Sequence, residues 1–260
     1  MMTSRRKNVL LTICLFFSGG IAPALSEGLS ETAQVELDYV HDFEGGVMTL
    51  NTSGNAPEAS TEEARNGDWS MKSVLTNSSP NKKRTEGLLP GSKKDKQLLY
   101  GRDYWYGFSS KLPADWKVPG KFELLAQFHG VADRPGDKGG VPLSIQMGRG
   151  TWMVRNQSVA GTRDWYGSPI TPDLGRWVDW VIHFRPSLDT DGLLEVWKGG
   201  ELIAERKGPN TTAKKLGPYF KMGYYHGPFK IGKKVIYHDE LRVASGPEAR
   251  YEDVDPANYE

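Results

Sequence analysis

The sequence predicts an all-β protein, a single domain folded as a two-sheet jelly-roll sandwich. Short runs of alternating apolar and polar residues recur along the chain, and this is the period of half-buried strands. Gly, Pro, Asn and Asp separate these runs and favour turns. We find no segment of convincing length with a helical period. About a dozen short strands joined by many turns are typical of a jelly roll.

Each expected strand is a run of this kind with turn residues at its ends. The strands are expected at 35–43, 70–75, 84–89, 104–112, 122–129, 143–147, 151–155, 177–185, 193–197, 201–204, 219–225 and 235–243. Gly199-Gly200 is predicted to form a two-residue hairpin turn, and 189–192 a second turn. Two polar loops are expected, at 77–83 and 132–140, and residues 246–260 form an acidic tail. We find no repeat, linker or second domain.

The first 26 residues have the pattern of a secretory signal peptide. Arg5, Arg6 and Lys7 precede an apolar run at 9–17, and Ala24 and Ser26 are small residues before a cleavage point. The apolar run is too short to cross a bilayer. We therefore expect a periplasmic or secreted bacterial protein, with no membrane span after cleavage and with its functional domain at 27–260, of which about 35–245 is the core.

Composition narrows the classes of function. The single cysteine, Cys14, lies within the signal, so the mature chain is expected to have neither a disulfide nor a thiolate site. Removal of three cations with the signal turns the formal net charge from +1 to −2. Nucleic-acid binders are usually strongly basic, so we expect no nucleic-acid partner, and we expect a monomer. The 8 Trp and 11 Tyr suit sugar stacking and core packing equally well.

Two of the predicted strands carry polar residues at alternate positions. Successive side chains point to opposite faces of a strand. Gln127 and His129 would therefore share a face with Leu125, while Leu124, Ala126 and Phe128 would face the core. On the strand at 219–225, one face would carry Tyr219, Lys221, Gly223 and Tyr225. The glycine leaves room for something to approach the strand. Taken singly, each strand could also be an amphipathic strand with a solvated face.

A third segment places Lys82, Arg84 and Glu86 on one face, which alone would suggest only a solvated charged face. Together and in this order, the three segments resemble the signature strands of the jelly-roll polysaccharide lyases of the alginate-lyase type. The matching residues are Arg84-Thr85-Glu86, Gln127-Phe128-His129 and Tyr219-Phe220-Lys221-Met222-Gly223-Tyr224-Tyr225.

The surrounding sequence is more similar to the heparin-lyase and glucuronan-lyase branch of that fold, and the resemblance covers most of 35–245. It implies a concanavalin-like sandwich. Two departures concern the substrate more than the reaction. Gly87-Leu88 replaces a second Arg of the first motif, and His226 replaces the continuation of the third motif towards Gln.

The resemblance implies cleavage of a 4-linked uronate polysaccharide by β-elimination, with an acidic polysaccharide as the partner. This reaction removes the proton on C5, so the neighbouring carboxylate must be neutralised. Gln127 and Arg84 are expected to do this, and Tyr225 to act as the acid and, in a syn elimination, as the base. His129 is the base in an anti elimination or else a neutral carboxyl partner. Further substrate contacts are expected from Lys82, Glu86, Tyr219 and Lys221.

The chemistry needs no metal or redox cofactor, but a structural Ca²⁺ between Glu44 and Asp239 is expected, because oxygen ligands from strand ends suit this ion. Ordinary surface carboxylates would have the same sequence pattern. Two other functions stay open. One is a carbohydrate-binding jelly roll without catalysis. The other is a glycoside hydrolase, suggested by Glu36-Leu37-Asp38, although its second carboxylate is missing at Val40 and His41.

Overall fold

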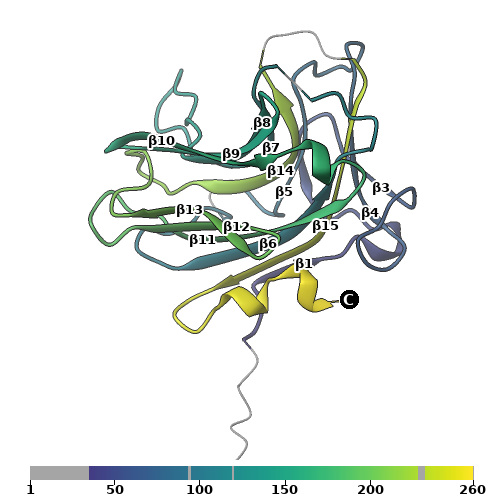
Figure 1. Ribbon diagram of the computed structural model, residues 1–260. Coiled ribbons are helices and arrows are strands. Elements are labelled where there is room, and N and C mark those ends of the chain that lie inside the picture. The colour runs from purple at the N-terminus through teal and green to yellow at the C-terminus, as the bar shows by residue number, and fades with distance from the viewer. Residues whose placement is uncertain (1–34, 93–94, 119, 228–231, 260) are drawn as a thin grey trace, which may run out of the picture. The chain divides into compact units, whose positions relative to one another are not determined.

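Two antiparallel β-sheets packed face to face form the part of the chain that the computed structural model describes, residues 35–92, 95–118, 120–227 and 232–259 (Figure 1). The β6 sheet has the strand order β13-β12-β11-β6-β15-β4-β3, with β1 also paired to β15. Its strands are β1 (Tyr39–His41), β3 (Glu58–Ser60), β4 (Ser70–Leu75), β6 (Tyr104–Lys111), β11 (Trp177–Arg185), β12 (Leu193–Lys198), β13 (Glu201–Lys207) and β15 (Lys234–Ser245).

The second sheet, here the β14 sheet, has the order β10-β9-β8-β7-β14-β5-β2. Its strands are β2 (Asn51–Gly54), β5 (Arg84–Leu88), β7 (Glu123–His129), β8 (Leu143–Gly148), β9 (Thr151–Ser158), β10 (Gly161–Pro169) and β14 (Tyr219–His226). Strands that are distant in the sequence, such as β5, β7 and β14, are hydrogen-bonded neighbours. This two-sheet antiparallel arrangement is the predicted jelly-roll sandwich in one domain.

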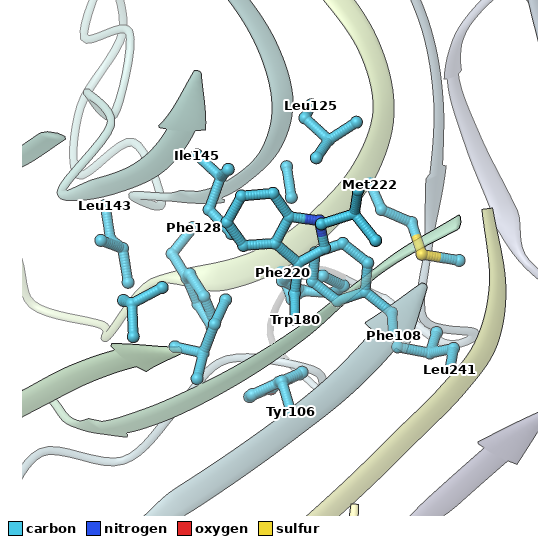
Figure 2. Packing of buried hydrophobic residues seen from close by; sticks show 14 of the residues in the cluster. Tyr106, Phe108, Leu125, Phe128, Leu143, Ile145, Trp180, Phe220, Met222 and Leu241 are labelled. Atoms are coloured by element: carbon cyan, nitrogen blue, oxygen red, sulfur yellow. The ribbon is translucent and has the colours of Figure 1, made fainter. Parts of the chain in front are cut away.

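The core between the sheets is rich in aromatic residues. Phe128 of β7 and Phe220 of β14 have ring centroids 5.1 Å apart, and Phe220 lies 5.7 Å from Phe108 of the opposite sheet (Figure 2). Trp180 is fully buried and donates its indole N–H to Ser110 Oγ at 2.9 Å. Each such side chain contributes about 1.5–3 kcal/mol by leaving water. The inner faces of the two sheets are therefore committed to packing, and the outer faces are left for other roles.

All twelve predicted strands overlap observed strands, and β4 and β11 have the predicted bounds, whereas the strand predicted at 35–43 is observed only as β1 at Tyr39–His41. Three strands were not predicted: β2, β3 and the edge strand β10. All β10 residues are at least partly exposed, and the sequence of β10 has no apolar alternation, so the hydrophobic pattern that identifies strands is missing. The predicted Gly199-Gly200 turn is confirmed, since both glycines have positive φ, 54° and 80°.

The acidic tail is folded, although no element was predicted within it. It contains two short 3₁₀ helices, η3 (Tyr251–Asp253) and η4 (Pro256–Tyr259), which lie against the outer face of the β6 sheet in Figure 1. Val254 is fully buried there. A Cβ at Gly107 of β6 would lie only 1.7 Å from the carbonyl oxygen of Val254, so this docking requires glycine. The predicted signal peptide, 1–26, falls outside the described residues, among which no helix is long and apolar enough to cross a membrane.

Candidate active site

Strand β14 is the centre of the candidate site, because it pairs with β7 on one side and β5 on the other. Phe220, Met222 and Tyr224 belong to the core cluster, so the residues that alternate with them lie on the outer face of the sheet. Across the strand pairs, Tyr219 is opposite His129, Lys221 opposite Gln127, and Tyr225 opposite Arg84. The structure therefore places the four predicted catalytic residues on one face of one sheet, on three adjacent strands.

A β-bulge sets the spacing of these residues. The pairing of β14 with β7 shifts between Met222 and Tyr225, and Gly223 within the bulge has a φ of 135°. A Cβ on Gly223 would lie 2.3 Å from the carbonyl oxygen of Thr85. The close approach that the sequence suggested for this glycine is therefore made by the backbone of β5. Bulges beside functional sites re-aim neighbouring side chains.

A second bulge corrects one sequence prediction. Leu125 was expected to share the outer face with Gln127 and His129, but it is 1 % exposed and packs in the core (Figure 2). The pairing of β7 with β8 shifts between Leu124 and Ala126. An extra residue at this point breaks the strict alternation, so Leu125 and Ala126 both belong to the core cluster. Gln127 and His129 lie beyond the bulge and keep the predicted parity.

Glu86 of β5 lies at the centre of a polar network. Its Oε1 accepts a hydrogen bond from Nε2 of Gln127. Its Oε2 lies 3.5 Å from Nη1 of Arg84 and 3.9 Å from Nζ of Lys221, and this ammonium is also 3.5 Å from Oγ of Ser53. We call Arg84, Glu86, Gln127 and Lys221 the Glu86 cluster. Three donors thus converge on one carboxylate and fix the orientation of the Gln127 amide.

The floor of the site is shielded from solvent although the opposite sheet does not cover it. Glu86 and Gln127 are each 2 % exposed and Lys221 is 3 % exposed. Burial raises the pKa of Glu86, while Lys221, Gln127 and Arg84 act in the opposite direction. Charges in such surroundings interact more strongly than in water. The cluster is therefore a preorganised set of donors rather than a solvated charged face.

Arg84 and Tyr225 form the more accessible part of the site. The Arg84 guanidinium lies over the Tyr225 ring at 4.6 Å from its centroid, and the Arg84 side chain is 26 % exposed. Tyr225 is half-buried. This cation–π contact orders both side chains at the more exposed end of the cluster.

His129 and Tyr219 lie at the opposite end of the site. Nδ1 of His129 is 2.8 Å from the carbonyl oxygen of Gly130. A carbonyl only accepts, so Nδ1 carries a hydrogen and Nε2 is the nitrogen at which a proton can be gained. The Tyr219 ring lies 5.7 Å from the His129 ring, and burial, followed by the charge of Glu86, raises the pKa of Tyr219 to about 12. Tyr219 therefore stays protonated over the ordinary range of pH.

Lys82 precedes strand β5, as it precedes the predicted strand at 84–89. Strand β5 begins at Arg84, and Lys82 lies in the preceding bend with an exposed side chain. Its carbonyl oxygen is 2.8 Å from Nε2 of His226, so its backbone ties the end of β14 to the bend. Alternation applies only within an extended strand, so it covers Arg84 and Glu86 but does not determine the side on which Lys82 lies.

The two residues proposed for calcium each receive backbone N–H groups from the segment before β4. Oε1 of Glu44 accepts from Asp68 at 3.0 Å and from Trp69 at 2.9 Å. Oδ2 of Asp239 accepts from Arg65 at 2.8 Å, and burial raises the pKa of Asp239 to about 7. In the described part of the chain no three acidic or His side chains gather around a point. A calcium ion would thus need backbone or water oxygens to complete its 6–8 ligands.

The sequence prediction missed the polar residues of β2, β8, β9 and β10 that share the outer face. Ser53 contacts Lys221, while Ser144 accepts a hydrogen bond from Gln146 at 2.7 Å. The alternation of Ser144 and Gln146 with apolar neighbours was a usable signal. Arg155 and Asp164 could be placed only from the pairing of the strands.

The structure thus defines a β-sandwich protein of jelly-roll type with this polar cluster on the outer face of one sheet. The family comparison agrees, since a model of the polysaccharide lyase family matches residues 36–242. The chain belongs to this family and is a polysaccharide lyase. The hydrolase-like residues Glu36 and Asp38 precede β1, which pairs within the β6 sheet.

Similar solved structures share the fold. An endo-β-1,4-glucuronan lyase from the fungus Trichoderma reesei has a TM-score of 0.61 at 20% identity, with 85% of this chain and 94% of that chain covered. A substrate complex of a family 7 alginate lyase has a TM-score of 0.53 at 16% identity, covering 74% of this chain and 84% of that one. A cellulose-induced protein has a TM-score of 0.57 at 16% identity, with 80% of this chain and 97% of that chain covered. A search of curated protein sequences finds no match.

Proposed function

We propose that this lyase cleaves a 4-linked uronate polysaccharide and that the Glu86 cluster binds the carboxylate of the residue that reacts. The cluster is the observation that carries the proposal. Arg84 and Lys221 supply two positive charges and Glu86 at most one negative charge, so the cluster keeps an excess of positive charge. One substrate carboxylate would balance that excess, and Gln127 would add an amide donor.

The same groups suit the chemistry of elimination. A base removes the proton on C5, the electron pair of that bond forms the double bond between C4 and C5, and the bond from C4 to the leaving oxygen breaks. Negative charge grows on the carboxylate in the transition state, where preorganised donors stabilise it more than the ground state. Tyr225, beside Arg84, is proposed to protonate the leaving oxygen.

The role of His129 depends on the configuration of the sugar at C5. In 4-linked glucuronate or mannuronate, the C5 proton and the leaving oxygen lie on the same side of the ring, so Tyr225 can serve both as base and as acid. In guluronate, the C5 epimer of mannuronate, the C5 proton and the leaving oxygen lie on opposite sides of the ring. A separate base must then approach the face that carries the C5 proton. Nε2 of His129, with Nδ1 held by Gly130, is the proposed base in that case.

Glucuronan is the first substrate to test, and alginate the second. The solved glucuronan lyase has the higher TM-score of the two lyases compared, 0.61 against 0.53, and 94% of that chain is covered. A glycosaminoglycan with 4-linked uronates would also present the required carboxylate. The proposal therefore specifies the 4-linkage and the carboxylate of the uronate, and leaves the other sugars of the polymer open to the test.

The test is a panel of purified polymers: glucuronan, mannuronan, guluronan, a glycosaminoglycan and an uncharged glucan. The unsaturated sugar ring formed by elimination absorbs in the ultraviolet, whereas binding or hydrolysis produces no such absorbance. We expect absorbance to rise with at least one uronate polymer and not with the glucan. Activity confined to polymers without 4-linked uronate would overturn the proposal. Activity on guluronan alone would assign the base to His129.

We also propose export to the periplasm or the medium, because a polysaccharide reaches an enzyme most readily outside the inner membrane. The motivating observation is the basic and then apolar start of the chain within 1–26. Sequencing the N-terminus of the protein isolated from its host tests this. A mature protein that starts at Glu27 is expected, and one that retains Met1 in the cytoplasm would contradict it.

A further inference from the structure

A polar row crosses the β14 sheet from the Glu86 cluster to the edge strand β10. The cross-strand partners in this row are Lys221, Gln127, Ser144, Arg155 and Asp164, one from each of β14, β7, β8, β9 and β10. Directly paired residues point to the same side of a sheet. Arg155 therefore lies on the same outer face as the cluster, although it is far from Lys221 in the sequence.

Arg155 has hydrogen-bonding capacity that the protein does not use. Its Nη1 lies 3.6 Å from Oδ2 of Asp164, which is longer than a normal hydrogen bond. Nε of Arg155 and Oδ1 of Asp164 are both shielded from solvent, with no hydrogen-bond partner among the described residues. The two side chains are 35% and 27% exposed. Asp164 therefore orients the Arg155 guanidinium but does not use all of its N–H donors. The guanidinium can still donate two hydrogen bonds to a second carboxylate.

The spacing along the row fits a 4-linked sugar chain. Arg155 is two strands away from Gln127, which is about 10 Å at ~4.8 Å per strand. One pyranose residue with its linking oxygen is about as long as one strand spacing. In an extended 4-linked chain, successive residues alternate in orientation, so every second carboxylate faces the same side. Between Gln127 and Arg155 the row holds only the uncharged Ser144, hydrogen-bonded to Gln146.

We propose that Arg155 binds the carboxylate of a second uronate, two residues along the chain from the one held by the Glu86 cluster. This inference rests on the proposed uronate substrate and deepens it. Arg155 is then a specificity-determining residue that makes the enzyme prefer polymers with acid groups at this interval. It adds binding energy away from the reacting bond, so its contribution falls on KM more than on kcat.

The experiment measures kcat and KM on size-fractionated uronate oligomers, from the shortest that is cleaved to those several residues longer. With the unsubstituted enzyme, kcat/KM should rise at the length at which the oligomer first reaches Arg155. In Arg155→Gln this rise should disappear, with KM on long oligomers increased about tenfold by loss of a charged hydrogen bond. Values for the shortest oligomers should stay unchanged.

Arg163→Gln is the matched control. Arg163 lies on the neighbouring strand β10 but points to the opposite face, where it stacks over Trp165 at 4.9 Å. The Arg163→Gln substitution removes the same charge as Arg155→Gln but leaves the polar row unchanged. This control should therefore keep the rise of kcat/KM with oligomer length. Arg155→Lys keeps the charge but loses the bidentate geometry, so it should recover only part of the rise.

Each outcome is distinguishable. If no uronate oligomer is cleaved by the unsubstituted enzyme, the proposed function itself fails. If oligomers are cleaved and Arg155→Gln keeps the full length dependence, or loses activity equally on short and long oligomers, only the role of Arg155 is overturned. Thermal melting of each variant shows whether it is folded. Should Arg155→Gln fail to fold, the Arg155→Lys series decides alone, and an unchanged length dependence there overturns the inference.

Discussion

Replacing the Tyr225 hydroxyl is the sharpest perturbation of the proposed chemistry. Tyr225→Phe removes one oxygen and its transferable proton but keeps the ring. The Arg84 guanidinium lies 4.6 Å from the centroid of that ring, and a phenyl ring preserves this contact. The backbone bulge at Gly223, which sets the position of residue 225, is also unaffected. The variant therefore isolates proton transfer from the architecture of the site.

The expected magnitudes for rate and binding differ widely. Loss of a general acid–base lowers kcat by about 10²–10⁴-fold, which corresponds to about 3–5 kcal/mol of transition-state stabilisation. Binding loses at most one hydrogen bond to the sugar, about 1 kcal/mol, so Kd should change by about fivefold or less. The prediction is therefore that Tyr225→Phe changes kcat far more than it changes Kd.

The assay follows ultraviolet absorbance of the unsaturated product for kcat, and calorimetry with an uncleaved oligomer for Kd. Tyr166→Phe is the control, because it removes a tyrosine hydroxyl from the edge strand of the same sheet, where Tyr166 is 58% exposed. That control should keep its rate within a few-fold. If Tyr225→Phe retained near-full activity, Tyr225 would not be the acid and the assignment would be wrong.

Three further outcomes are expected. Arg84→Ala should raise KM and lower kcat together, because Arg84 would meet the carboxylate in both the ground state and the transition state; a change in KM alone would remove it from the chemistry. Glu86→Ala should lower the free energy of unfolding, measured in urea, by about 3–5 kcal/mol, since it leaves the buried Lys221 without its carboxylate; a loss below about 1 kcal/mol would contradict this. If Ca²⁺ binds at Glu44 and Asp239, a chelator should lower Tm, whereas an unchanged Tm with the metal shown to be removed would exclude the ion.

Much of the fold was predictable because period-2 alternation is a local property of the sequence. The strand at 219–225 shows this, since its core and outer residues alternate as predicted. Strand β10 was missed because it gains its place from pairing with β9 rather than from an apolar face. Leu125 was assigned to the wrong face because a bulge depends on the partner strand, and no residue within 122–129 identifies it.

The candidate site also has features that the sequence predicts and features that depend on the pairing of strands. The shared faces of Gln127 with His129 and of Lys221 with Tyr225 follow from parity within single strands. The central position of Glu86, bonded to Gln127 from another strand, depends on the order β5-β14-β7, which the sequence does not reveal. The side of the sheet on which Lys82 lies could not be taken from parity, because Lys82 precedes β5. Arg155 joins the row only through the register of three strand pairs.

The most direct measurement of the central claim takes the uronate polymer that the enzyme cleaves, with glucuronan tested first, and compares it with the same polymer after its carboxylates have been chemically reduced to alcohols. Length, linkage and ring configuration are then matched, and only the group that the Glu86 cluster is proposed to bind is changed. The account predicts ultraviolet-absorbing product from the native polymer and none from the reduced polymer, which also should not inhibit the reaction at equal concentration. Equal cleavage of the two polymers, or cleavage of the reduced one alone, would contradict it.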